Sequence, residues 1–150
     1  MKQPLSIILL GEPASGKATQ SKLLLKKYKL IDIDMGKKLR KLNRQNAHKK
    51  VLDQTMKVGK LAPSGLVKNI LKNKILSTSN KKGILLDGTP KMLSEAKLVV
   101  SLLKKAKRHS PIVIYLSVPA SEIYKRANVR KEYVRGKWSK RPDDSKQAIK

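Results

Sequence analysis

The residues best suited to chemistry lie near the start of the chain, where two glycines enclose a short loop. Gly11 and Gly16 bound this loop, and Lys17 and Thr19 follow it. An apolar run at 5–10 precedes the loop, and a helical pattern follows it. In this order, loop N–H groups and the positive end of a helix face an anion, and the lysine adds a mobile charge. The spacing therefore predicts a site that holds a polyphosphate.

The loop departs at one position from the general phosphate-loop pattern G-x-x-x-x-G-K-[ST]. Ala18 follows the lysine, and the hydroxyl comes one residue later, at Thr19. The alternative interpretation is a chance turn of small residues between a strand and a helix. The strand before the loop and the helix after it favour phosphate binding.

The composition indicates one domain with an aliphatic core. Hydrophobic residues make up 39% of the 150 residues, but the chain has no Phe, one Trp and no Cys. The absence of cysteine excludes disulfides and thiolate chemistry. No apolar run reaches the roughly 18 residues of a membrane span, and the first run is shorter than a signal-peptide core of about 7–15 residues. We therefore expect no membrane span and a cytoplasmic protein.

The charge of the chain is strongly positive. Lys and Arg total 36 against 10 Asp and Glu, which gives a formal net charge of +26. Such a field attracts nucleotides, nucleic acid and anionic lipid. The lysines are spread along the chain, and the aromatic residues that stack on bases are few. We favour a lysine-rich solvated surface, with a nucleic-acid-binding surface as the alternative.

The hydrophobic pattern predicts strands that alternate with helices. Strands are expected at 5–10, 31–33, 83–87 and 111–118. Helices are expected at 17–28, 35–46, 49–58, 64–76, 93–108 and 119–129, the last with Pro119 at its first position. This alternation predicts an α/β domain with a parallel sheet, whose ligand lies at the carboxyl ends of the strands.

Two further expectations concern the second half of the chain. The last clear strand is expected to bury the apolar side chains of Ile112, Val113, Ile114 and Leu116. The basic segment 132–140 indicates an exposed loop or short flap, and residues 142–150 indicate the start of a last helix.

Several motifs in this order resemble those of the adenylate kinases, a family of nucleoside monophosphate kinases. GEPASGKATQ at 11–20 resembles the family's G-x-P-G-S-G-K-G-T-Q, and GKLAP at 59–63 resembles G-x-L-V-P. LLDGTPK at 85–91 resembles L-L-D-G-F-P-R. Val118-Pro119 with Arg126 and Arg130 resembles V-P…R-x-x-x-R, and RPDD at 141–144 resembles R-x-D-D. The resemblance extends from Leu5 to Lys150.

The resemblance implies a P-loop fold of three layers, α/β/α, with a central parallel sheet of about four strands. It implies a single domain over 1–150, with its core at 1–34 and 77–129. A helical segment that binds the monophosphate would span about 35–76, and a short lid about 130–141. The family's pattern continues with a further arginine, a last strand and a helix. We therefore expect a fragment, a reduced family member or an inactive form, with residues 112–116 less covered than usual.

The activity implied by the resemblance is transfer of the γ-phosphoryl group of ATP to AMP or a related monophosphate, with Mg²⁺ as cofactor. A monomer is expected. The alternative is a kinase-like protein that binds nucleotide or nucleic acid with weak or no turnover. The catalytic residues implied are Lys17, Asp87, Arg126, Arg130 and Arg141.

The same resemblance implies two binding sites. The ATP site would comprise Gly11, Pro13, Ala14, Ser15, Gly16, Lys17, Ala18, Thr19, Arg126 and Arg130. The monophosphate site would comprise Met35, Gly36, Arg40, Lys60, Leu61, Ala62, Gly88, Thr89, Pro90, Lys91, Glu95 and Arg141. Mg²⁺ would be held through the nucleotide and water near Thr19 and Asp87, without a direct protein ligand.

The monophosphate side departs from the family's pattern. Met35 and Lys37 replace the threonine and the aspartate of T-G-D-x-x-R, whereas Arg40 is kept. Lys91 replaces an arginine and loses its bidentate fork. Glu95 replaces a glutamine that reads adenine, and a carboxylate only accepts hydrogen bonds. This departure predicts a weaker preference for AMP and use of GMP, unless Glu95 is simply a surface helix residue.

Overall fold

The computed structural model describes residues 4–44, 48–56, 59–130, 132–134 and 137–139. Its central sheet contains four parallel strands in the order β2-β3-β1-β4. The strands are β1 (Ser6–Gly11), β2 (Ile31–Asp34), β3 (Ile84–Asp87) and β4 (Ile112–Leu116). The helices are α1 (Lys17–Tyr28), α2 (Met35–Arg44), α3 (Lys49–Thr55), α4 (Ser64–Ser77), α5 (Leu93–Lys105) and α6 (Ala120–Val129). The predicted α/β class and the parallel sheet are confirmed.

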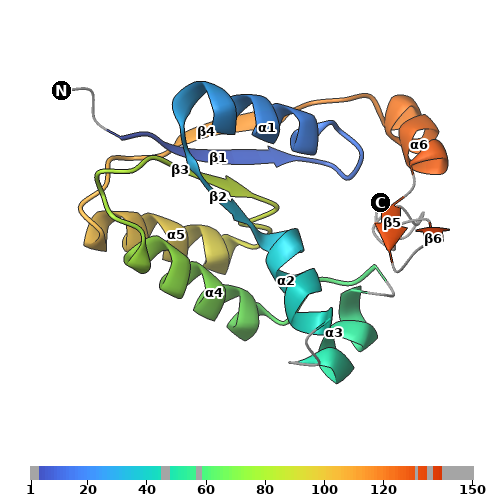
Figure 1. The fold of residues 1–150 in the computed structure, drawn as a ribbon, viewed down its shortest axis with the longest axis horizontal. Coiled ribbons are helices and arrows are strands. Elements are labelled where there is room, and N and C mark those ends of the chain that lie inside the picture. The colour runs from blue at the N-terminus through green and yellow to red at the C-terminus, as the bar shows by residue number, and fades with distance from the viewer. Residues whose placement is uncertain (1–3, 45–47, 57–58, 131, 135–136, 140–150) are drawn as a thin grey trace.

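The sheet lies between two layers of helices, with α1 on one face and α4 and α5 on the other (Figure 1). Side chains alternate between the two faces along each strand. Ile7 and Leu9 of β1 therefore pack on the α1 side, where Leu24 and Leu25 of α1 meet them. Ile8 packs on the opposite side. Both cores are aliphatic, as the composition predicts.

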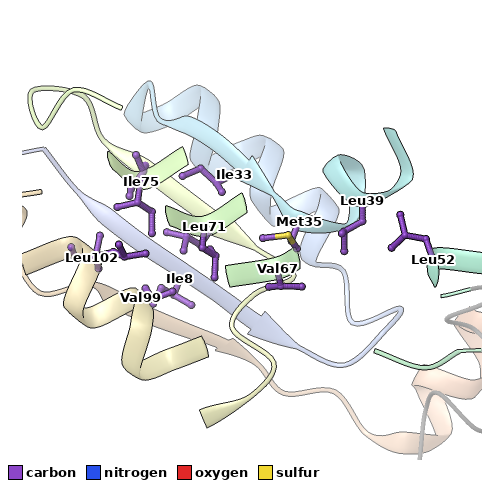
Figure 2. Packing of buried hydrophobic residues seen from close by; sticks show 13 residues of the cluster. Ile8, Ile33, Met35, Leu39, Leu52, Val67, Leu71, Ile75, Val99 and Leu102 are labelled. Atoms are coloured by element: carbon purple, nitrogen blue, oxygen red, sulfur yellow. The ribbon is translucent and has the colours of Figure 1, made fainter. Parts of the chain in front are cut away.

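The larger core continues from the sheet into the helical segment after β2. Ile8 and Ile33 of the sheet contact the same cluster as Leu71 of α4 and Val99 of α5. Figure 2 shows that Met35 and Leu39 of α2 and Leu52 of α3 extend this cluster beyond the end of β2. The helices between β2 and β3 therefore pack on the sheet through one continuous apolar cluster.

The register of the strands brings the carboxyl ends of all four strands together on one side of the sheet. Asp34 of β2 stands beside Asp87 of β3. Gly11, which ends β1, stands beside Leu116, which ends β4. Because all four strands are parallel, their carboxyl ends meet on this side, where a ligand is expected in such folds.

The strand β4 lies at an edge of the described sheet, and its side chains are more exposed than its apolar sequence predicts. Ile112 is 51% exposed and Val113 is 57% exposed, whereas Ile114 and Leu116 are half-buried. The expectation of burial is therefore wrong for Ile112 and Val113, because among the described strands β4 pairs only with β1. The expectation of reduced cover at 112–116 agrees with these exposures.

The segment expected to be a loop or flap contains two short strands. β5 (Glu132–Val134) and β6 (Lys137–Ser139) pair as an antiparallel hairpin. Each strand has only three residues, which is too short for a pattern of alternating apolar and polar residues to reveal it. Pro119 precedes α6 at its N-cap position and is not its first residue. The helix expected at 142–150 lies outside the described residues, and no helix in the described part of the chain is long and apolar enough to span a membrane.

Candidate active site

The loop that follows β1 is held in a tight conformation by its two glycines. Gly11 has a φ of 146°, and a Cβ atom there would lie 2.9 Å from the carbonyl oxygen of Leu116. Gly16, with a φ of 97°, occupies the N-cap position of α1. Ala14 also has a left-handed backbone, with a φ of 61°. Left-handed residues within such a turn are typical of loops whose successive N–H groups converge on an anion.

The side chain of Lys17 folds over this loop. Its Nζ atom donates hydrogen bonds to the carbonyl oxygens of Gly11, at 2.6 Å, and Glu12, at 2.7 Å. The first turn of α1 thus places the ammonium group above the loop that precedes the helix. This arrangement puts a positive charge where the sequence predicts bound phosphate.

The charges around Lys17 come from distant parts of the chain. Burial lowers the pKa of the Lys17 ammonium, and the charge of Asp87 opposes this effect most strongly. Lys91 and Arg130 lower the pKa further through charge repulsion. The fold therefore brings one carboxylate and two more cations close to the loop, as required of a site that handles several phosphate charges.

A cavity of about 620 Å³ opens beside the loop, within the range of about 300–1,000 Å³ that is usual for ligand pockets. Ser15, Gly16 and the first turn of α1 line one side, residues 115–118 line another, and Arg126 of α6 completes it. Glu122 accepts a 2.6 Å hydrogen bond from Nε of Arg126 and so orients the guanidinium group. The cavity combines the loop with one of the arginines that the sequence assigned to it.

Asp87 ends β3 and has a partner that the sequence analysis missed. The Oγ atom of Ser21 in α1 donates a 2.6 Å hydrogen bond to Oδ2 of Asp87. Both residues are buried, Ser21 at 6% and Asp87 at 9% exposure. The available signal was the spacing, since Ser21 lies one helical turn after Lys17 on the face that α1 turns toward the sheet.

The oxygen atoms near the loop are of the kind that fits the Mg²⁺ ion implied by the family resemblance. Asp87 supplies a carboxylate and Thr19 a hydroxyl at the start of α1, and a hard cation prefers such oxygen donors. The hydrogen bond from Ser21 occupies one carboxylate oxygen of Asp87 and leaves the other for a different partner. The residues therefore fit the ion.

A second group of residues assembles around the start of α2. A Cβ atom at Gly36 would lie 3.0 Å from Nη1 of Arg40 and 3.4 Å from Oδ1 of Asp34. A Cβ atom at Gly88, in the turn after β3, would lie 3.8 Å from the backbone N of Gly36. Gly36, Arg40 and Gly88, three of the residues expected at the monophosphate site, thus lie close together. Asp34 was missed, although an aspartate just before a helical pattern is a common N-cap, and it accepts a 2.8 Å hydrogen bond from the Lys37 N–H.

Glu95 lies in the first turn of α5 and is only 3% exposed. Its Oε2 atom accepts a 2.8 Å hydrogen bond from the backbone N–H of Lys91. The alternative that Glu95 is a surface residue is therefore wrong. Thr89, in the turn between β3 and α5, is buried as well.

The remaining predicted residues occupy varied positions. Met35 is a core residue, and Ala62 packs against the same core. Lys60 and Leu61 are exposed in the connection between α3 and α4. Pro90 follows Thr89 through a cis peptide bond. Arg141 lies outside the described residues.

Comparison with known proteins gives a consistent result across the chain. A family model described as adenylate kinase matches residues 9–150. An adenylate kinase of Parabacteroides distasonis is 32% identical over 147 residues, which cover 97% of this chain and 75% of the relative. An adenylate kinase of Azobacteroides pseudotrichonymphae is 35% identical over 146 residues, which cover 97% of this chain and 74% of the relative. An adenylate kinase of Archaeoglobus fulgidus is 32% identical over 128 residues, or 85% of this chain and 59% of the relative.

Proposed function

The chain belongs to the adenylate kinase family of phosphotransferases, and we propose that it transfers the γ-phosphoryl group of ATP to a nucleoside monophosphate. The products are ADP and a nucleoside diphosphate. The observation that carries this proposal is the position of Lys17, whose Nζ atom lies over the Gly11–Gly16 loop within the charge environment of Asp87, Lys91 and Arg130. Phosphoryl transfer depends mainly on positioning and on stabilising negative charge, which such a cluster supplies.

In this proposal the cavity beside the loop binds ATP. The loop N–H groups and Lys17 hold its β- and γ-phosphates, and Thr19 and Asp87 hold Mg²⁺ through water. The ion supplies further neutralisation of the phosphate charge when bound. Arg126, Arg130 and, from the proposed lid at 130–141, Arg141 stabilise the charge that develops during transfer.

The acceptor binds, in the same proposal, between the helical segment 35–76 and the turn after β3. Arg40 holds its phosphate, with Lys91 as a second cation. The Glu95 carboxylate faces the base. It already accepts one hydrogen bond from Lys91, but its two oxygens offer about four acceptor positions. Guanine presents donors at N1 and N2, so we propose that GMP is accepted at least as well as AMP.

An assay of ADP formation from ATP with AMP, GMP, CMP and UMP in turn tests this function. Lys17→Ala should lower kcat/KM by about 100-fold or more, because it removes a charge that stabilises the transition state. Lys22→Ala is the matched control, since Lys22 is an exposed lysine on the same helix, and it should change kcat/KM by less than about twofold. Absence of ADP formation with all four acceptors would contradict the proposal.

A further inference from the structure

Ser21 occupies a position where a helix of this kind normally carries an apolar residue. It is the buried residue of α1, whereas Leu24 and Leu25, on the same side of the helix, are only partly buried against the sheet. A helix that packs on a sheet generally buries aliphatic side chains there. A buried hydroxyl at this interface needs a polar partner, and the Asp87 carboxylate provides it.

The hydrogen bond between Ser21 and Asp87 joins two rigid elements. Its 2.6 Å length lies within the range of about 2.5–2.7 Å that is typical of a hydroxyl bound to a carboxylate. Asp87 is fixed at the end of β3, in register with Leu9 on one side and with Asp34 on the other. Ser21 is fixed one turn after Lys17. The contact therefore restricts the orientation of a carboxylate whose backbone is already held by two neighbouring strands.

The orientation of this carboxylate matters because its charge acts on Lys17. Asp87 opposes the effect of burial on the Lys17 pKa, so the carboxylate helps to keep the ammonium group charged. Once Oδ2 accepts the Ser21 hydrogen bond, the carboxylate has a defined direction for its remaining acceptor positions. Supporting contacts of this kind fix the geometry of residues that hold a metal ion.

We propose that Ser21 is a positioning residue that orients the Asp87 carboxylate for the Mg²⁺–nucleotide complex. The inference rests on the proposed function, because it assigns Asp87 to the Mg²⁺ side of the ATP site. A merely structural contact between α1 and β3 would affect stability alone. A positioning role affects the dependence of nucleotide binding on Mg²⁺ concentration, which is a separate measurement.

Titration calorimetry with a non-hydrolysable ATP analogue, repeated over a series of Mg²⁺ concentrations, tests the proposal. Ser21→Ala should raise the Mg²⁺ concentration for half-maximal tightening of binding by about tenfold, the size expected from losing a hydrogen bond to a charged group. Ser21→Thr keeps the hydroxyl and should stay within about twofold of the parent protein. Ser6→Ala is the matched control, because Ser6 is a buried serine whose Oγ has no hydrogen-bond partner among the described residues.

Two further variants keep the test decisive. Ser21→Cys keeps the shape of the side chain, although sulfur is somewhat larger than oxygen, and its thiol donates only weakly. It should therefore raise the Mg²⁺ requirement as Ser21→Ala does, and it replaces Ser21→Ala in the test if that variant fails to fold. In an Asp87→Asn background, Ser21→Ala should have no further effect on the Mg²⁺ dependence. An unchanged Mg²⁺ dependence in Ser21→Cys, with nucleotide still bound, overturns this inference alone. Failure of the parent protein to bind the analogue at any Mg²⁺ concentration overturns the proposed function as well.

Discussion

The Glu95 carboxylate accepts a hydrogen bond of 2.8 Å from the backbone N–H of Lys91 and so ties the first turn of α5 to the turn that ends β3. Glutamine at this position can still accept that hydrogen bond through its carbonyl oxygen. Glu95→Gln should therefore keep the fold while it changes the groups offered to the acceptor base. A substitution at residue 95 can therefore test the selectivity for the acceptor base without disturbing the fold.

We expect Glu95→Gln to lower the ratio of kcat/KM for GMP to kcat/KM for AMP by about tenfold or more. The carboxylate can accept hydrogen bonds from N1 and N2 of guanine, whereas the amide group of glutamine would leave some of these polar groups unpaired. Steady-state kinetics with both acceptors measure this ratio. The affinity for ATP serves as the internal control and should not change. A parent protein that strongly prefers AMP and a variant with the same preference would contradict the role of Glu95.

Arg108 connects the end of α5 to the loop before β3. Its guanidinium group donates hydrogen bonds to the carbonyl oxygens of Lys82, Thr78 and Ser79, at 2.8, 3.0 and 2.7 Å respectively. Arg108→Met should lower the free energy of unfolding by about 2–3 kcal/mol, because these charge-assisted bonds are lost. Urea denaturation measures the change. Lys104→Met, an exposed lysine in α5, is the control, and equal midpoints for the two variants would contradict the prediction.

Asp32 in β2 is expected to make the stability of the fold depend on pH. Burial raises the pKa of its carboxyl above the usual 3.8, and the charges of Asp34 and Asp87 raise it further, while Lys37 and Lys38 oppose them. The native state therefore binds this proton more tightly than the unfolded state, so the contribution of Asp32 to stability falls as the pH rises from about 3.8 through the raised pKa.

Asp32→Asn removes this ionisation. The variant should melt about 1–3 °C above the parent protein at pH 7, and the difference should disappear below the usual pKa of 3.8. Thermal unfolding followed by circular dichroism at both pH values checks the prediction. A variant that is less stable at pH 7, or equally shifted at both pH values, would contradict it.

The outer edge of β4 has no partner among the described strands, and this predicts self-association. An edge strand with apolar side chains is a template for pairing with another chain. Val113→Lys should reduce concentration-dependent light scattering and should change the unfolding free energy by less than about 1 kcal/mol. Val100→Lys is a matched control, since both valines are 57% exposed but Val100 lies in α5. Equal effects of the two substitutions would indicate a general effect of charge instead of strand pairing.

Features that depend on the pattern of neighbouring residues were predicted well from the sequence. The bounds of α1 were predicted to the residue, because Gly16 marks its start. The burial of β4 was not predicted correctly, because an apolar run such as Ile112–Leu116 looks the same in a central strand and in an edge strand. Strand order is set by packing between distant segments, which a local pattern does not encode.

The same distinction applies to the candidate site. The positions of the loop at Gly11–Gly16 and of Asp87 could be predicted because Gly11 and Asp87 end strands, and parallel strands end at one edge of the sheet. Ser21 was missed because its partner lies 66 residues away in the sequence. The hydrogen bond of Glu95 was missed because it depends on how the turn at Gly88–Lys91 meets α5.

The order of the strands also affects how the loop at Gly11–Gly16 forms as the chain is synthesised. β1 pairs only with β3 and β4 in the described sheet, and these are the last two of the four strands along the chain. Gly11 stands beside Leu116, the last residue of β4. During synthesis, the first strand therefore emerges long before either of its neighbours, and pairing at such separation is slow. The loop proposed to bind phosphate is encoded at the start of the chain, whereas the strand that pairs with its first residue, Gly11, is encoded about 100 residues later.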